Sequence, residues 1–346
     1  MHPVNKGCDT MTIKDLAAKT GYAVATVSRV LNNHPNVSEK ARAAIMQAVE
    51  ESGFQLNANA KQLKQQHATS ILVVVKGTGN ELFSELVETI QSHVAETQYP
   101  LFVDYLDEES NEVRRAVQLC REKKPLGILF LGGSSRNFQT DFGKIDIPCV
   151  VVTNDMSHLN FPNLSSVAID DKEACRCAVD TLVRKGHRKI VLVGGERVIS
   201  DTGRARYEGC LESLQAHGIP FDEEKDYRAV RFSYEGGYRG TMDLLESGRE
   251  FTALFAAADV MAIGAIRALR DKGLHVPEDI SVAGFDGLHL GSYLVPKLSS
   301  VAQPAQKMGR RSVEILLACI EDGAAAVHET VPFAILERGS VAPIKE

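Results

Sequence analysis

The 346-residue sequence contains no tryptophan, few aromatic residues and no long apolar run. A helix that crosses a membrane needs about 20 consecutive apolar residues, so we expect no transmembrane segment and no membrane partner. Residues 1–9 are polar and lack the apolar core of a secretory signal peptide. These absences predict a cytoplasmic protein.

Clusters of residues that carry chemistry are equally scarce. The seven cysteines are scattered, and the C-x-C spacing of Cys175 and Cys177 is typical of neither a zinc site nor a redox site. The histidines are not paired at metal-ligand spacing, and the glycine pairs form neither a G-x-G-x-x-G motif nor a phosphate-binding loop. We therefore expect free thiols and no catalytic residue, metal or cofactor.

The net charge of −6 is unevenly distributed along the chain. Basic residues outnumber acidic ones between Met11 and Ala68, so the rest of the chain carries more than the whole negative charge. A basic segment on an acidic body is what a nucleic-acid-binding module attached to a sensor domain would show. This asymmetry alone does not identify a DNA-binding protein.

Residues 11–54 show the pattern of three short helices. Thr12 can cap a helix that runs to Lys19, and a second helix of residues 24–31 follows a tight turn at Gly21. Ser38 can cap a third helix. Three short helices with a tight turn between the first two are typical of a helix-turn-helix. The polar, amide-rich residues 55–68 then resemble a linker.

From residue 69 to residue 340, short apolar runs alternate with amphipathic stretches. Continuous apolar strands between helices predict parallel sheets covered on both faces. The runs exceed one ordinary sheet, so we expect an α/β body of two doubly wound lobes with a ligand between them, beyond the C-terminal strand ends. The expected strands are residues 71–75, 101–105, 127–131, 149–152, 190–193, 229–232, 253–256 and 281–285, with a last run at 331–336.

Specific motifs narrow this interpretation. Residues 12–45, TIKDLAAKTGYAVATVSRVLNNHPNVSEKARAAI, closely resemble the DNA-binding head of the LacI/GalR family of transcription regulators. The resemblance continues, in the family's order, at GHRKIVLVGG, GRARYEGC, FAAADVMAIGAI and VPEDISVAGFDG. It implies a repressor whose partners are operator DNA and a small-molecule effector. It also implies a body of the type I periplasmic-binding-protein fold, with two lobes joined by three crossover strands.

The resemblance assigns base contacts to the second helix of the head, which would enter the major groove. Val24 and Ala25 hold the family's main specificity positions and can contact thymine methyl groups, whereas Arg29 can bind a guanine through two hydrogen bonds. Val27 and Val30 are expected in the helical core. The other residues of the head that we expect at the DNA are Thr12, Thr26, Ser28 and Asn32.

The segment NANAKQLK, residues 57–64, resembles the hinge helix of the same family. Leu63 holds the position of a leucine that wedges into the minor groove, which unstacks a base step and bends the DNA. Asn57 and Lys61 are expected to contact DNA beside it. Because Leu56 stands where the family usually has proline, a plain flexible linker is the alternative.

For the effector site, the resemblance implies two charged residues that bind ligand oxygens. Arg206 matches an arginine whose planar fork suits hydroxyls or a carboxylate, and Asp286 matches an acid that accepts from sugar hydroxyls. Asp259 matches a frequent aspartate, which could also cap the helix 260–272. This set favours a sugar or a sugar phosphate as the effector.

The first lobe should add an aromatic residue and a polar group. Phe83 matches an aromatic at the cleft edge, although a plain core residue is the alternative. Thr153, Asn154 or Asp155 should supply the polar group, with Thr153 as our candidate.

Other functions share this body. A transporter's solute-binding protein would need a signal peptide and no helix-turn-helix, and an enzyme would need a catalytic cluster. A transcription regulator whose effector is a partner protein remains a third alternative. The closing residues SVAPIKE are too short for the heptad tail of the family's tetramers, so we expect a homodimer.

Overall fold

The computed structural model describes residues 13–31, 37–52 and 69–344. The chain divides into two compact units, Met1–His67 and Ala68–Glu346; we call them the head and the body. The finer boundaries that the sequence suggests, 11–54, 55–68 and 69–340, stay predictions, because residues 55–68 lie outside the described ranges.

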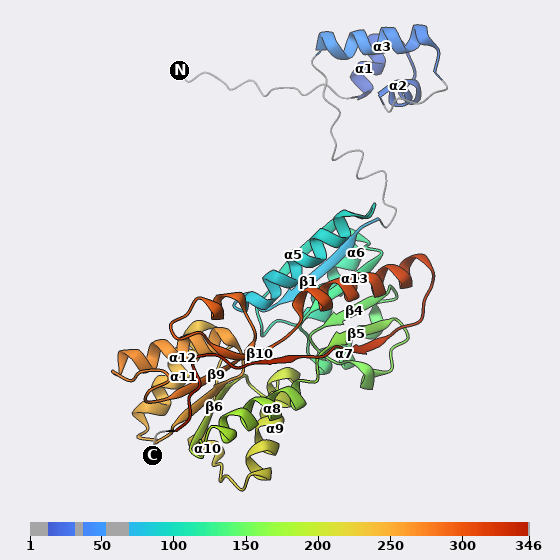
Figure 1. The fold of residues 1–346 in the computed structure, drawn as a ribbon. Helices are drawn as coiled ribbons and strands as arrows, with labels where there is room; N and C mark the ends of the chain where they lie inside the picture. Colours follow the sequence, from blue (N-terminus) through green and yellow to red (C-terminus); the bar gives the residue numbers. More distant parts are fainter. Residues whose placement is uncertain (1–12, 32–36, 53–68, 345–346) are drawn as a thin grey trace, which may run out of the picture. The chain divides into compact units, whose positions relative to one another are not determined.

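Three short helices form the head: α1 (Ile13–Thr20), α2 (Val24–Leu31) and α3 (Glu39–Ser52) (Figure 1). Leu16, Val27 and Ile45, one from each helix, are fully buried against one another. Val30 joins them, which confirms that the two inner valines of α2 are core residues. This core fixes α2 with its opposite face toward solvent.

The first lobe of the body, which we call the N-lobe, is a parallel six-stranded sheet in the order β11-β5-β4-β3-β1-β2. Its side chains alternate between two apolar layers. Val73 and Leu129 face α5 and α13, whereas Leu72 and Phe130 face α6 and α7. The elements are β1 (Ile71–Lys76), α5 (Glu81–Ala95), β2 (Leu101–Leu106), α6 (Glu112–Lys123), β3 (Gly127–Leu131), α7 (Ser135–Asp141), β4 (Cys149–Val152), β5 (Leu164–Ala168), α13 (Ala305–Glu321) and β11 (His328–Thr330).

The second lobe, the C-lobe, has a six-stranded sheet in the order β12-β10-β9-β8-β6-β7, in which only the edge strand β12 is antiparallel. Helices α8 and α9 pack together, as do α11 and α12 (Figure 1). The elements are α8 (Asp171–Arg184), β6 (Ile190–Gly194), α9 (Asp201–Ala216), α10 (Glu223–Asp226), β7 (Tyr227–Ala229), α11 (Tyr234–Glu246), β8 (Ala253–Ala256), α12 (Asp259–Asp271), β9 (Ser281–Asp286), β10 (Ser299–Ala302) and β12 (Ala334–Leu336).

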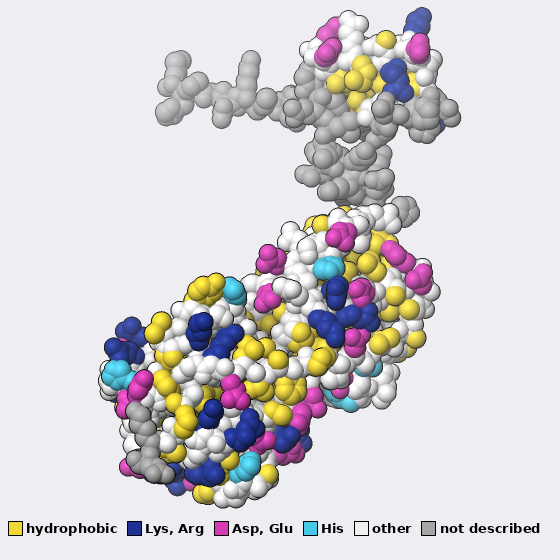
Figure 2. Space-filling view, in the orientation of Figure 1, with side chains coloured by type: hydrophobic (Ala, Val, Ile, Leu, Met, Phe, Trp, Pro, Cys, Tyr) yellow, Lys and Arg dark blue, Asp and Glu magenta, His cyan; other side chains and the backbone are white. Residues whose placement is uncertain are grey.

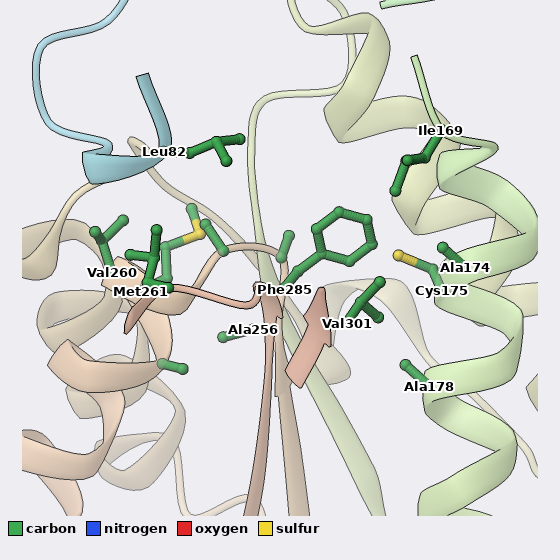
Figure 3. Close-up of a cluster of buried hydrophobic side chains, with 14 of the residues drawn as sticks. Leu82, Ile169, Ala174, Cys175, Ala178, Ala256, Val260, Met261, Phe285 and Val301 are labelled. Atoms are coloured by element: carbon green, nitrogen blue, oxygen red, sulfur yellow. The ribbon is translucent and has the colours of Figure 1, made fainter. Parts of the chain in front are cut away.

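The chain passes between the two lobes three times, at residues 169–170, 303–304 and 331–333. The apolar core continues across this junction. Phe285 lies in a cluster with Cys175 and Val301 of the C-lobe and Leu82 of the N-lobe (Figure 3). The predicted α/β class with two doubly wound lobes is thereby confirmed.

The structure corrects some of the expected strands. The expected strand 229–232 is wrong in its bounds. Strand β7 spans Tyr227–Ala229, and residues 230–232 line the space between the lobes. The sequence pattern does not predict strands at the runs LSSVA and SSVA, because serines interrupt their apolar pattern. In the structure these serines are buried and hydrogen-bonded, for example Ser165 to the N–H of Val327 and Ser300 to Asp259.

The surface and the helices agree with the composition. Lysine and arginine side chains lie among aspartate and glutamate side chains on the face of the body seen in Figure 2. Within the described ranges, no helix is long and apolar enough to cross a membrane.

Candidate functional site

A cavity of about 330 Å³ lies between the two lobes, and we call it the cleft. Its walls come from the C-terminal ends of parallel strands: Lys76 ends β1, Gly132 and Gly133 follow β3, and Glu196 follows β6. Ligands bind at this edge of doubly wound sheets because the loops that follow the strands converge there. The size of the cleft suits a small organic molecule.

Two aromatic rings line the cleft, one from each lobe. Phe83 of α5 packs on Gly132, where an added Cβ would lie 3.1 Å from the ring. Phe232 lies on Gly195, where a Cβ would lie 2.2 Å from the ring. Both rings therefore depend on a glycine at a strand end, and they offer flat apolar surfaces to a ligand.

Arg206 of α9 is the buried cation of the cleft, with only 4% of its surface exposed. Its Nε donates to Asp171 Oδ1 at 2.6 Å and its Nη1 donates to the carbonyl oxygen of Ala257 at 2.6 Å. The guanidinium lies 3.8 Å from the centre of the Phe285 ring. These contacts fix its plane, and because it lines the cleft its remaining N–H groups can serve a ligand.

Asp286 lies directly behind this wall and is buried. Its carboxylate accepts from Asn80 Nδ2 at 3.0 Å and from Gln303 Nε2 at 2.8 Å, and it lies 3.7 Å from Arg206 Nη1. Burial raises the pKa of Asp286 to about 6, and the nearby Arg206 opposes this rise. Asp286 has a φ of 113°, a strained value for a residue with a side chain, and such strain is concentrated at functional sites.

Asp259 lies deeper still, at the first position of α12. It accepts from the N–H of Leu288 and from Ser300 Oγ, each at 2.7 Å, and so holds the turn after β9. Burial, followed by repulsion from Asp286, raises its pKa to about 8. Asp259 therefore fixes the turn that follows Asp286, and it does not itself line the cleft.

The N-lobe contributes polar groups at the end of β4. Thr153 and Asn154 are buried and line the cleft, whereas Asp155 is exposed and accepts from Ser157. Thr153 has a φ of 81°, again in the left-handed region. Asn154 is fixed by donating to the carbonyl oxygen of Gly133 at 3.2 Å.

Several residues of the cleft escaped the sequence analysis. Lys76 forms an ion pair of 2.6 Å with the fully buried Glu112, and Asn80 joins the lobes through Asp286. Arg231 of the C-lobe pairs with Glu108 of the N-lobe at 2.9 Å. Their common signal is a position at the end of a strand or within a few residues after it, which marks the correct edge of the sheet without showing which side chains reach the cleft.

Direct contacts between the lobes border the cleft. Besides its bond to Glu108, Arg231 pairs with Asp107, and Tyr234 Oη donates to Glu81. These contacts can exist only while the lobes are close together. We call this arrangement of the two lobes closed.

The head offers a second candidate surface on α2. Val24 is 43% exposed, and Ala25 and Arg29 are also exposed, whereas Thr26 and Ser28 are half-buried. The exposed residues share the face opposite the core, as a groove-reading helix requires. The other residues predicted to contact DNA lie outside the described residues; they are Thr12, Asn32, Asn57, Lys61 and Leu63.

Comparisons with known proteins agree with this arrangement. The model of the bacterial regulatory proteins of the lacI family matches residues 12–57, and that of the periplasmic binding protein-like domain matches residues 179–341. The transcriptional regulator MalR of Clostridium butyricum is 34% identical over 337 residues, which cover 95% of this chain and 99% of that protein.

Solved structures give the same answer. The lac repressor dimer bound to operator and the anti-inducer ONPF is 26% identical, with a TM-score of 0.74 over 96% of this chain and 100% of the other. The complex of the transcriptional regulator CelR with cellobiose is 26% identical, with a TM-score of 0.68 over 95% and 99% of the two chains. Head and body together define a DNA-binding transcription regulator with an effector-binding body. The chain belongs to the LacI family.

Proposed function

We propose that this chain is a homodimeric, cytoplasmic repressor whose operator affinity is set by a sugar or sugar phosphate bound in the cleft. The observation that carries this proposal is the composition of the cleft. Phe83 and Thr153 come from one lobe and Arg206 from the other, so a ligand must touch both lobes. A ligand that bridges two lobes binds the closed arrangement better than the open one, which is the condition for a shift between them.

The proposed roles follow the geometry. Arg206 donates to ligand oxygens, Thr153 and Asn154 bind from the opposite side, and Phe83 packs on an apolar face of the ligand. Asp286 and Asp259 act as positioning residues: Asp286 holds Arg206 and Asn80, and Asp259 supports the turn behind it. Their carboxylates therefore contribute to ligand binding through Arg206 and Asn80.

DNA recognition is assigned to the head. Val24, Ala25 and Arg29 would read base edges, while Thr26 and Ser28, together with Thr12 and Asn32, would contact the backbone or neighbouring bases. Asn57, Lys61 and Leu63 would form the hinge segment at the operator centre. A change in the closure of the body would alter the spacing of the two hinge segments in a dimer, and the coupling of about 1–3 kcal/mol is ordinary for allosteric systems.

A homodimer is supported by an apolar segment on the C-lobe. Tyr293 is 69% exposed and Val295 is 96% exposed, within two residues of each other. Exposed apolar groups of this kind are typical of interfaces. Light scattering at micromolar concentration should give the mass of a dimer, and Val295→Asp should shift the mass toward that of a monomer.

The test of the function is an operator titration. DNA selected from random sequence by the full chain should be a rough palindrome. One compound from a library of sugars, sugar phosphates and purines should then change the affinity of the protein for this DNA at least about fivefold. Selection of no sequence would contradict the repressor assignment. Turnover of a library member by the purified chain would favour an enzyme instead.

A further inference from the structure

The charge balance of the cleft identifies its ligand more narrowly. Lys76 is a cation of the cleft wall, but its Nζ already contacts Glu112 Oε2 at 2.6 Å. Glu112 is fully buried and also accepts from the N–H of Ser134 at 2.7 Å. If Lys76 turned toward a ligand anion, Glu112 would stay behind as an uncompensated buried charge, which is strongly unfavourable.

The positive charge of Arg206 is likewise compensated by buried carboxylates. It faces two buried carboxylates, Asp171 at 2.6 Å and Asp286 at 3.7 Å. A buried ion group with two acids around one guanidinium has no positive charge left to offer. Arg206 can still donate hydrogen bonds, but to a group that adds no negative charge.

The third cation of the described cleft wall, Arg231, is shared between Asp107 and Glu108. Glu109 and Glu196 also line the cleft, and each adds a further carboxylate. Carboxylates therefore outnumber cations in and directly behind the wall. A cleft with this balance repels anions, because a single sign of charge dominates a confined space.

A phosphate group carries a charge of about −1.5 to −2 near neutral pH. In this cleft it would have to displace a carboxylate from its cation, whereas an uncharged hydroxyl can donate to a carboxylate and accept from Asn80 or Asn154. The rings of Phe83 and Phe232 suit the apolar C–H faces of a sugar ring. We propose that the cleft binds an uncharged saccharide and discriminates against sugar phosphates and sugar acids. This inference rests on the proposed function and selects one half of its ligand class.

The test uses matched probes on the full chain in isothermal titration calorimetry. The uncharged probes are D-glucose, D-ribose, maltose and cellobiose; the charged ones are glucose 6-phosphate, ribose 5-phosphate and glucuronate; adenosine represents uncharged aromatic ligands. We expect at least one uncharged sugar to bind and every charged probe to bind at least tenfold more weakly. A charged probe that binds as tightly, or adenosine as the tightest ligand, would overturn the inference.

The outcomes separate this inference from the proposed function. A charged probe that binds and changes operator affinity overturns the inference alone, and the small-molecule repressor stands. If no probe binds, both the inference and the small-molecule part of the proposed function fail.

A pair of variants tests the physical reason. Glu108→Gln removes a partner of Arg231 and so releases positive charge, whereas Glu109→Gln removes the same charge from the wall without releasing an arginine. The preference for the uncharged sugar over glucose 6-phosphate should fall at least fivefold in E108Q and clearly less in E109Q. Equal changes in the two variants would contradict the argument from paired cations.

Discussion

Asn80 Nδ2 donates to Asp286 Oδ2 at 3.0 Å, and this bond joins the start of α5 in one lobe to the end of β9 in the other. The oxygen of the same amide accepts from the N–H of Leu82 and caps α5. The cap fixes the orientation of the amide, so its N–H groups point toward Asp286 without further ordering. Opening of the lobes must break this bond.

Asp286→Asn should therefore weaken the effector response. The substitution removes a counterion of Arg206 and replaces one of the two oxygens that accept from Asn80 and Gln303 by an N–H donor, so the closed arrangement is less favourable. We expect ligand affinity to fall at least about tenfold, which is about 1.4 kcal/mol, while specific operator binding survives. Fluorescence anisotropy of labelled operator, titrated with the sugar found by calorimetry, measures both quantities.

Asp243→Asn is the matched control, because Asp243 is exposed on α11 and, within the described part of the chain, forms an ion pair only with Arg228. It should respond like the wild type. Equal ligand sensitivity in D286N and D243N would show that Asp286 plays no part in effector binding.

Arg29→Ala should weaken specific DNA binding. Arg29 is exposed on the face of α2 opposite the core, so its loss leaves the fold of the head intact. A bidentate contact to guanine contributes about 1–3 kcal/mol of discrimination, and one base position of the operator should lose its preference. Binding-site selection with the mutant measures this, and an unchanged base preference would refute the assignment of α2 to the major groove.

Leu63→Ala tests the predicted hinge, which lies outside the described residues. An apolar wedge bends DNA by unstacking a base step, so the variant should bend the operator less and bind it more weakly. Gel mobility of permuted operator fragments reports the bend, and calorimetry with the effector is the control, which should not change. The same bend in both proteins would make residues 55–68 a plain linker.

The pH dependence of stability should reflect Asp259. Its pKa rises from 3.8 in the unfolded chain to about 8 in the folded body, chiefly because of burial. The folded state then binds the proton more tightly, so this contribution to stability is complete below about pH 4 and is lost as the pH rises to about 8. Between pH 5 and pH 8, the free energy of unfolding of the wild type should fall with rising pH more steeply than that of Asp259→Asn, by about 1 kcal/mol per pH unit.

Urea denaturation at a series of pH values measures that slope. Asp107→Asn is the control, because hydrogen bonds from Glu109 and Arg231 lower the pKa of Asp107, so it titrates below this range. A slope in D259N equal to that of the wild type would show that Asp259 does not titrate between pH 5 and pH 8.

The sequence alone predicts most of the fold, because apolar runs such as 127–131 and 253–256 coincide with observed strands. It fails where burial is satisfied by hydrogen bonds, as in the serine-containing β5 and β10. The candidate site is likewise predictable from the sequence only in part. Phe83, Thr153 and Arg206 line the cleft, but the sequence could not show that Asp286 lies behind the wall or that Lys76 is bound to Glu112, because both depend on contacts between distant segments.

The three passages of the chain between the lobes also determine the order in which the protein can be completed during synthesis. The N-lobe begins with β1 at residue 71, yet α13 and β11, which cover part of one face and one edge of its sheet, are not made until residues 305–330. Translation proceeds from the N-terminus, and apolar surface that stays uncovered invites aggregation. A nascent chain that stops after β5 thus carries a nearly complete sheet with one face only partly covered and one edge unpaired, before any residue of the C-lobe has been made. Neither lobe is formed by a single continuous stretch of the sequence.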